Sequence, residues 1–177
     1  MNKLTHIGEV LSLNNNLSYD RIIPREVIQM LKSFSSTQKA YIAGFLDADG
    51  SIYARAKPNH TYRYGFQIAL YVVFFQSAKD KENFMQVCRL IGCGRIRERS
   101  DGILEYVINK TDNIKEFLKC VQPYVVLKKK QVELMLRIID VKKRGKTKND
   151  FESLLKLVDS YRELNYSKKR KHRVLTP

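Results

Sequence analysis

The stretch YIAGFLDADGS, residues 41–51, joins an apolar run to two carboxylates and a glycine. Ala40, Ala43, Gly44 and Asp47 recur at i, i+3, i+4 and i+7, so they share one face of a helix. Glycine inside a helix costs about 1 kcal/mol relative to alanine, so Gly44 requires a packing reason. The stripe of small side chains predicts a dimer interface in which the same helix of a second subunit packs closely against this one.

Asp47 and Asp49 stand at the end of this helix, followed by Gly50. A twofold dimer through the stripe would bring both copies of Asp49 together beneath a sheet, where they could bind a metal ion. The short D-x-D-G string is also compatible with an ordinary helix-ending turn at Gly50. The string alone therefore leaves two readings open.

The charge of the chain limits the kind of partner. Its 177 residues are enough for one compact domain with short extensions, and Lys and Arg outnumber Asp and Glu 33 to 18, for a formal charge of +15. Such a surplus favours a polyanion, and nucleic acid is the leading candidate. No run reaches the roughly 18 apolar residues of a spanning helix, and the N-terminus lacks the apolar core of a signal peptide. We expect a soluble intracellular protein, in a prokaryotic cytoplasm or in a chloroplast or mitochondrion.

Periodicity along the rest of the chain predicts an α+β domain over residues 35–165, between an N-terminal extension (1–34) and a basic C-terminal tail (166–177). Ser35 and Gln38 fit a capping box at the start of the first helix. Alternating segments predict one hairpin over 51–76, with its turn at PNHT, and another over 94–109, with its turn at SDG. Further helices are expected over 79–92, 113–122, 128–143 and 150–164.

Alternation assigns each strand residue to one of the two faces of the expected antiparallel sheet. The face toward the helices comprises Ile52, Ala54, Phe66, Ile68, Leu70, Val72, Ile96, Leu104, Tyr106 and Ile108. The outer face comprises Tyr53, Arg55, Lys57, Gln67, Ala69, Tyr71, Val73, Arg95, Arg97, Arg99, Glu105 and Val107, and Asn59 in the turn and Tyr62 at the start of the second strand extend it. Its five basic residues meet one acid, which favours a surface that reads bases and phosphates over a merely solvated one.

The first stretch resembles the LAGLIDADG motif of homing endonucleases. The match is at Ala43, Gly44, Asp47, Ala48, Asp49 and Gly50. The resemblance extends over about residues 36–173, through KPN after the first strand, QPYVVLKKKQ and LNYSKKRK. Within that family, this chain is similar to the single-motif, homodimeric branch. That resemblance implies the α-β-β-α-β-β-α fold with a saddle-shaped, four-stranded antiparallel sheet and one active site formed by two chains.

The resemblance also implies roles for the two acids. Asp49 is similar to the ligand of a divalent metal, Mg2+ or Mn2+, with the backbone carbonyl of Ala48 as a second ligand. Asp47 is similar to the first acid of the motif, which caps and supports the helix interface.

Further active-site residues follow from the same resemblance. Gln76 and Lys128 resemble the peripheral residues that orient solvent and stabilise charge on the phosphate. The family places a basic residue four positions after the glutamine, where this chain has Asp80. Lys81 is the expected substitute, and Lys79 is its rival.

The implied activity is that of an intron-encoded homing endonuclease, which hydrolyses double-stranded DNA at a long pseudo-palindromic site and leaves 3′ overhangs. No small-molecule substrate or membrane partner is expected. An RNA maturase, or a DNA-binding protein that no longer cleaves, would use the same fold and the same basic surface. In the C-terminal tail, Ser167, Lys168, Arg170 and Lys171 are expected on the DNA backbone, although a disordered basic end has the same composition.

Overall fold

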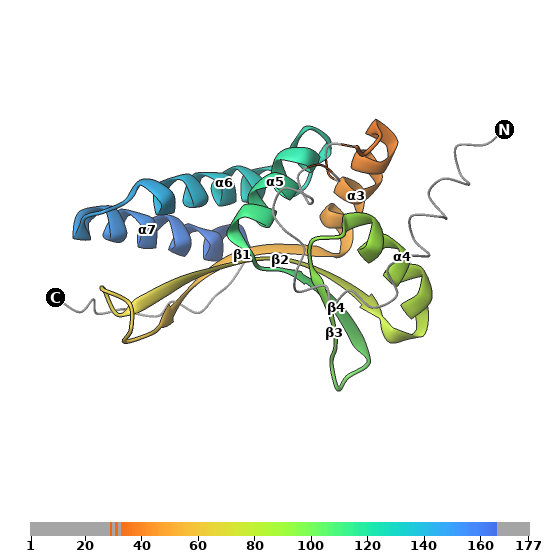
Figure 1. The fold of residues 1–177 in the computed structure, drawn as a ribbon, viewed down its shortest axis with the longest axis horizontal. Helices are drawn as coiled ribbons and strands as arrows, with labels where there is room; N and C mark the ends of the chain where they lie inside the picture. The colour runs from red at the N-terminus through yellow and green to blue at the C-terminus, as the bar shows by residue number, and fades with distance from the viewer. Residues whose placement is uncertain (1–28, 30, 32, 166–177) are drawn as a thin grey trace.

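A computed structural model describes residues 29, 31 and 33–165 of the protein. Helices lie on one face of a four-stranded antiparallel sheet, and no helix among these residues covers the opposite, concave face (Figure 1). The elements are α3 (Ser36–Asp49), β1 (Gly50–Pro58), β2 (Phe66–Ser77), a 3-10 turn (Ala78–Asp80), α4 (Lys81–Ile91), β3 (Arg95–Glu98), β4 (Ile103–Ile108), α5 (Thr111–Val121), a second 3-10 turn (Gln122–Tyr124), α6 (Lys129–Arg144) and α7 (Lys148–Leu164). This α+β arrangement confirms the expected fold class.

The two hairpins meet through their inner strands, in the order β1-β2-β4-β3. β4 pairs with only the second half of β2, from Val72 to Ser77. Beyond that point, residues 53–58 of β1 pair with residues 66–71 of β2 as a two-stranded ribbon. The ribbon extends away from α3, beneath α6 and α7 (Figure 1).

The core lies between the helices and the face of the sheet that alternation assigned to them. Most of the residues expected there are at most 9% exposed: Ile52, Ala54, Ile68, Leu70, Val72, Leu104, Tyr106 and Ile108. Ile96 is an exception, with 38% of its surface exposed, because it lies on the edge strand β3, all four residues of which are exposed. Phe66 is only half-buried, near the tip of the ribbon.

Local signals set the ends of several elements. Ser35 and Gln38 form the expected capping box, with N–O distances of 2.9 and 3.2 Å, and Thr147 and Asp150 form another at α7. The chain differs from expectation around Tyr62, which lies in the turn of the first hairpin and not in β2. Gly65 explains this shift, because its positive φ of 74° closes the turn and β2 begins only at the next residue, Phe66.

The core also includes side chains N-terminal to Ser35. Leu31 is 3% exposed and Phe34 is 7% exposed, and both pack in the main apolar cluster. Cys88, Cys93 and Cys120 are free thiols, and burial raises the pKa of Cys93 to about 12. No described helix is long and apolar enough to cross a membrane.

Candidate active site and nucleic-acid interface

Asp47 connects the end of α3 to the start of α6. Its carboxylate accepts hydrogen bonds from the backbone N–H groups of Val126, Leu127 and Lys128, at 2.7, 3.0 and 2.9 Å. These groups precede α6, where the positive end of the helix dipole favours a negative charge. The Lys128 ammonium in turn donates to the backbone carbonyl of Asp47. Asp47 therefore has a structural role within its own chain and holds Lys128 at the end of α3, and its part in a helix interface between chains stays a prediction.

Asp49, two residues later, is different. It is exposed, and within the described part of the chain its carboxylate has no hydrogen bond or ion pair. It is the last residue of α3, and no basic residue lies in the last turn of that helix. The negative end of the helix dipole and an unpaired carboxylate both favour a cation at this position.

One chain supplies few ligands for a metal ion. No group of three or more His, Cys, Asp and Glu side chains that could hold a metal occurs among the described residues. The carboxylate of Asp49 and the backbone carbonyl of Ala48 are hard oxygen donors of the kind that Mg2+ and Mn2+ prefer. The residues present thus fit a divalent ion shared between two chains better than one held by a single chain.

Gln76 lies at the same end of the sheet as Asp49. Gly50, the first residue of β1, pairs with Phe74, and Gln76 is two residues further along β2. Its amide oxygen accepts from the N–H of Ser77 at 2.8 Å, so the donors that its side chain can offer to a ligand are those of the NH2 group. The fold therefore gathers Gln76, Lys128 and Asp49 from three separate segments.

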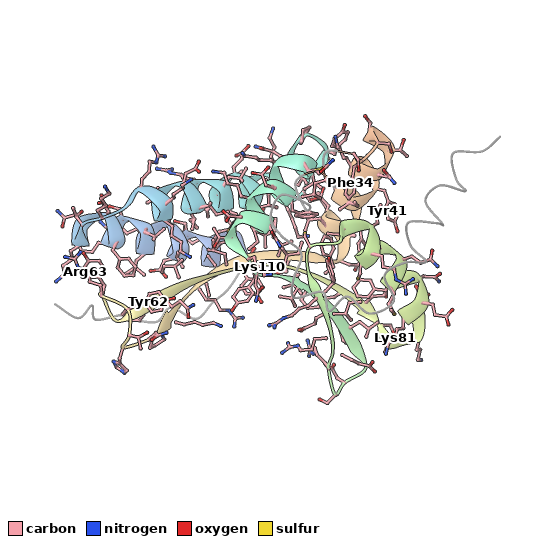
Figure 2. All side chains as sticks on the ribbon, viewed as in Figure 1. Phe34, Tyr41, Tyr62, Arg63, Lys81 and Lys110 are labelled. Carbon is pink, nitrogen blue, oxygen red and sulfur yellow. The ribbon has the colours of Figure 1, made fainter. Side chains whose placement is uncertain are left out.

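The second basic residue of the site stays a prediction. Lys81, at the start of α4, donates to Glu98 of β3 at 3.0 Å, and its ammonium has two further N–H groups that could contact a phosphate. Figure 2 shows Lys81 at the end of α4 nearest the β3–β4 hairpin. Lys79 is exposed in the 3-10 turn, and Asp80 accepts from the Asn83 amide at 2.6 Å.

The residues exposed on the outer face of α3 are not all the ones expected for the interface stripe. Ala43 has no exposed surface, because it packs into the core of its own chain, so its assignment to the stripe is corrected. Ala40 and Gly44 are exposed, and a Cβ added at Gly44 would meet nothing within 4 Å. Tyr41, which is 57% exposed, takes the place of Ala43 on the outer face.

Two apolar residues beside α3 were missed by sequence reasoning. Val126 and Leu127 are 76% and 75% exposed, and their backbone N–H groups are held by Asp47. The sequence signal for this pair was its position outside any periodic segment and directly before a run of lysines. Tyr41 of α3 is also largely exposed, and contiguous apolar surface is typical of a protein interface, so these three side chains are candidates for contact with a partner.

Aromatic and basic side chains share the concave face of the ribbon. Tyr53 and Tyr71 stack with ring centroids 4.9 Å apart. The Arg55 guanidinium lies over the Tyr53 ring at 4.9 Å, and the Lys57 ammonium donates to the Tyr71 hydroxyl at 2.6 Å. Burial is the main cause that raises the pKa of Tyr53. These contacts hold two cations in place on a surface suited to a polyanion.

The second hairpin carries an ion-pair network on the same face. Arg97 donates from Nε to Glu105 at 3.0 Å. Arg99 donates to Glu105 at 3.5 Å and to Asp101 at 2.6 Å. Glu105 is 8% exposed, so it lies under the two arginines and does not itself form an open contact surface. The guanidinium groups remain accessible, with 66% and 44% of the Arg97 and Arg99 side chains exposed.

The remaining expected DNA-facing residues differ in their surroundings. Val73 is only 2% exposed, because strands flank it on both sides and Tyr71 and Phe75 neighbour it on the same face; its assignment to the open surface is corrected. Gln67, Ala69 and Val107 are partly exposed, and Arg95 and Tyr62 are exposed. Asn59 uses its side-chain oxygen to hold Thr61 in the turn, at 3.1 Å from the Thr61 N atom. Ser167, Lys168, Arg170 and Lys171 lie outside the described residues.

Comparison with known proteins identifies the family. The LAGLIDADG endonuclease model matches residues 42–141. The chain is 35% identical over 132 residues to the DNA endonuclease I-CreI of Chlamydomonas reinhardtii, covering 74% of this chain and 80% of the relative. It is 34% identical over 110 residues to the DNA endonuclease I-CvuI of Chlorella vulgaris, covering 62% and 67%.

Solved structures agree with the sequence comparisons. I-CvuI bound to its target in the presence of calcium superposes with a TM-score of 0.71 at 29% identity, covering 77% of this chain and 87% of that one. I-CvuI bound to the I-CreI target in the presence of magnesium, with the DNA not cleaved, gives 0.70 at 28% identity, covering 78% and 87%. These similarities extend over both hairpins and their helices, so the chain belongs to the LAGLIDADG endonuclease family.

Proposed function

We propose that the protein is a homodimeric, site-specific endonuclease that cleaves both strands of DNA with Mg2+ or Mn2+ and leaves 3′ overhangs. The observation that carries this proposal is the contrast between the two acids of α3. The Asp47 carboxylate accepts three hydrogen bonds from backbone N–H groups. Asp49 is exposed and has no protein partner within the described residues. A chain that had lost cleavage would have no need of an unpaired carboxylate at a helix C-terminus, where it is unfavourable.

Phosphodiester hydrolysis requires a positioned water, neutralised phosphoryl oxygens and help for the leaving alkoxide. A divalent ion at Asp49 and the Ala48 carbonyl would supply a Lewis acid and lower the pKa of a bound water. Lys128 stabilises charge on the phosphate, and Asp47 keeps its backbone in place for this role. Gln76 orients solvent through its amide group.

The dimer forms through the exposed face of α3. Gly44 has open space where a side chain would be, so a second copy of the helix can approach its backbone closely. Tyr41, Val126 and Leu127 add apolar surface beside it. A twofold axis at this contact places two copies of Asp49 near each other, which supplies the ligands that one chain lacks.

The concave face of the sheet holds the DNA. Arg55 and Lys57 on the first hairpin, and Arg95, Arg97 and Arg99 on the second, give it a cationic surface that continues from one hairpin to the other. A two-stranded ribbon fits the major groove of B-DNA. I-CvuI, which has the same fold, has been solved in complex with DNA, which supports a DNA-binding role for this surface.

The test compares the wild type with Asp49→Asn. The wild type is expected to cut members of a randomised duplex library in Mg2+, and the variant is expected to cut none. Binding of the selected duplex in Ca2+ should remain within about tenfold, because Asp49 contacts the metal and no base. Residual cutting by the variant, or loss of its binding, would contradict the assigned role.

A further inference from the structure

The outer half of the first hairpin lacks the third strand that the rest of β2 pairs with. Residues 53–58 and 66–71 pair only with each other, because β4 ends its pairing at Val72. A two-stranded ribbon alone is marginally stable in water. This half nevertheless carries Arg55, Lys57 and Gln67, which belong to the proposed reading surface.

Ala54, Ile68 and Leu70 anchor the base of this ribbon in the core, and two further contacts attach it to the helices nearer its tip. The rings of Tyr64, in the turn, and Phe151, in the first turn of α7, lie 5.0 Å apart between centroids. The Lys142 ammonium of α6 donates to the backbone carbonyl of Ile68 at 3.0 Å. The Arg63 guanidinium also lies 5.3 Å from the centre of the Tyr64 ring.

A cavity of about 460 Å³ separates the ribbon from the helices around these contacts. Its lining includes Tyr62, Phe66, Lys142, Thr147 and Phe151. Figure 2 shows Tyr62 and Arg63 at the tip of the ribbon, near the end of the α6–α7 pair and far from Tyr41 on α3. Because this cavity lies beyond Ile68, the tip of the ribbon is attached to α7 through the Tyr64–Phe151 contact and not through a continuous core.

We infer that Phe151, through Tyr64, is a positioning residue that sets the angle of the reading hairpin and thereby determines specificity at the outer base pairs of each half-site. The inference rests on the proposed DNA-binding function. The ribbon tip is the part of the sheet farthest from α3, so it meets the base pairs farthest from the dyad (Figure 1). Base readout needs side chains held within a narrow range of positions, so a hinged tip discriminates poorly.

The first experiment compares Phe151→Ala with Leu157→Ala. Leu157 is on the same helix, is also partly buried and packs on the core away from the ribbon tip, so it controls for general weakening of α7. Each protein is used to select bound duplexes from a randomised library. In Phe151→Ala, preference at the outer positions should fall roughly tenfold, with the inner positions unchanged, whereas Leu157→Ala and Phe151→Tyr should keep the wild-type profile.

The second experiment uses free protein and needs no DNA. Amide hydrogen exchange across residues 55–71 should accelerate in Phe151→Ala and stay near the wild-type rate in Leu157→Ala. Equal exchange in both variants, or a loss of preference spread over all positions, would overturn the inference. If the wild type selects no duplex at all, the proposed function fails instead, and the exchange result still decides whether Phe151 holds the hairpin.

Discussion

At the scale of single residues, two carboxylates two positions apart have opposite environments. Asp47 accepts three backbone hydrogen bonds from the segment before α6, and Asp49 accepts none from the described residues. The difference follows from the helix, because a separation of two residues turns side chains to different sides. Asp47 therefore contributes to folding, and Asp49 is available for chemistry.

Alanine substitutions should separate these roles. Asp47→Ala is expected to lower the free energy of unfolding by about 1–2 kcal/mol, because it removes the acceptor at the start of α6. Asp49→Ala should change it by less than about 0.5 kcal/mol, since the side chain is exposed and unpaired. Urea denaturation of both variants measures the difference, and equal losses would show that the two acids are not distinct.

At the scale of elements, α3 has one face in the core and one face exposed. Ile42, Ala43 and Leu46 are fully buried, whereas Ala40, Tyr41 and Gly44 are not. The helix can thus be altered on its outer face without disturbing its own domain.

Gly44→Leu should abolish the dimer without unfolding the chain. An added Cβ meets no atom within 4 Å, and leucine improves helix propensity by about 1 kcal/mol over glycine. Sedimentation at micromolar concentration should show a dimer for the wild type and a folded monomer for the variant. Ala43→Leu is the matched control, because overpacking a buried site should destabilise the domain by about 1–3 kcal/mol. A wild type that sediments as a monomer would count against the interface.

The β3–β4 hairpin is expected to read bases through its arginines. Arg97→Ala and Arg99→Ala should each cost about 1–3 kcal/mol of binding and relax preference at one position of each half-site. Glu105→Gln should alter both positions together, since Glu105 is bonded to both guanidinium groups. Arg89→Ala, on the exposed side of α4, serves as the control. A uniform loss across all sequences would assign Arg97 and Arg99 to phosphates instead.

At the scale of the whole molecule, the concave sheet and the charge of +15 act together. The positive field is expected to accelerate association with DNA of any sequence, and in the proposed complex the hairpins discriminate among sequences. In the proposed dimer the two reading surfaces are related by a dyad.

The target site should therefore be a pseudo-palindrome of about 20 base pairs, because each hairpin surface follows about one helical turn of major groove. At its centre, sequence preference should come from how easily the DNA bends, because the paired helices there present acids and no side chains that contact bases. Selection of cleaved sites from a randomised library gives the motif directly. A recovered site of about ten base pairs without dyad symmetry would rule out the dimeric arrangement.

Residue types and spacing were sufficient for much of this molecule. Alternation identified the buried face of β1, β2 and β4 because a strand between helices and solvent has only two faces. The Ser35 cap, and glycines with positive φ at positions 92 and 102, ended elements where expected because those signals act within a few residues. The motif around Asp49 identified the family for the same reason, since its residues are contiguous.

Only the tertiary structure decided which residues meet across the sequence. It buried Ala43 and Val73, placed Glu105 beneath two arginines, and brought Lys128 to Asp47 over a separation of 81 residues. Periodicity gives the direction of a side chain relative to its own helix or strand, but its burial depends on which other elements pack on that side. Those contacts arise from the packing of segments far apart in the chain, and no local pattern encodes them.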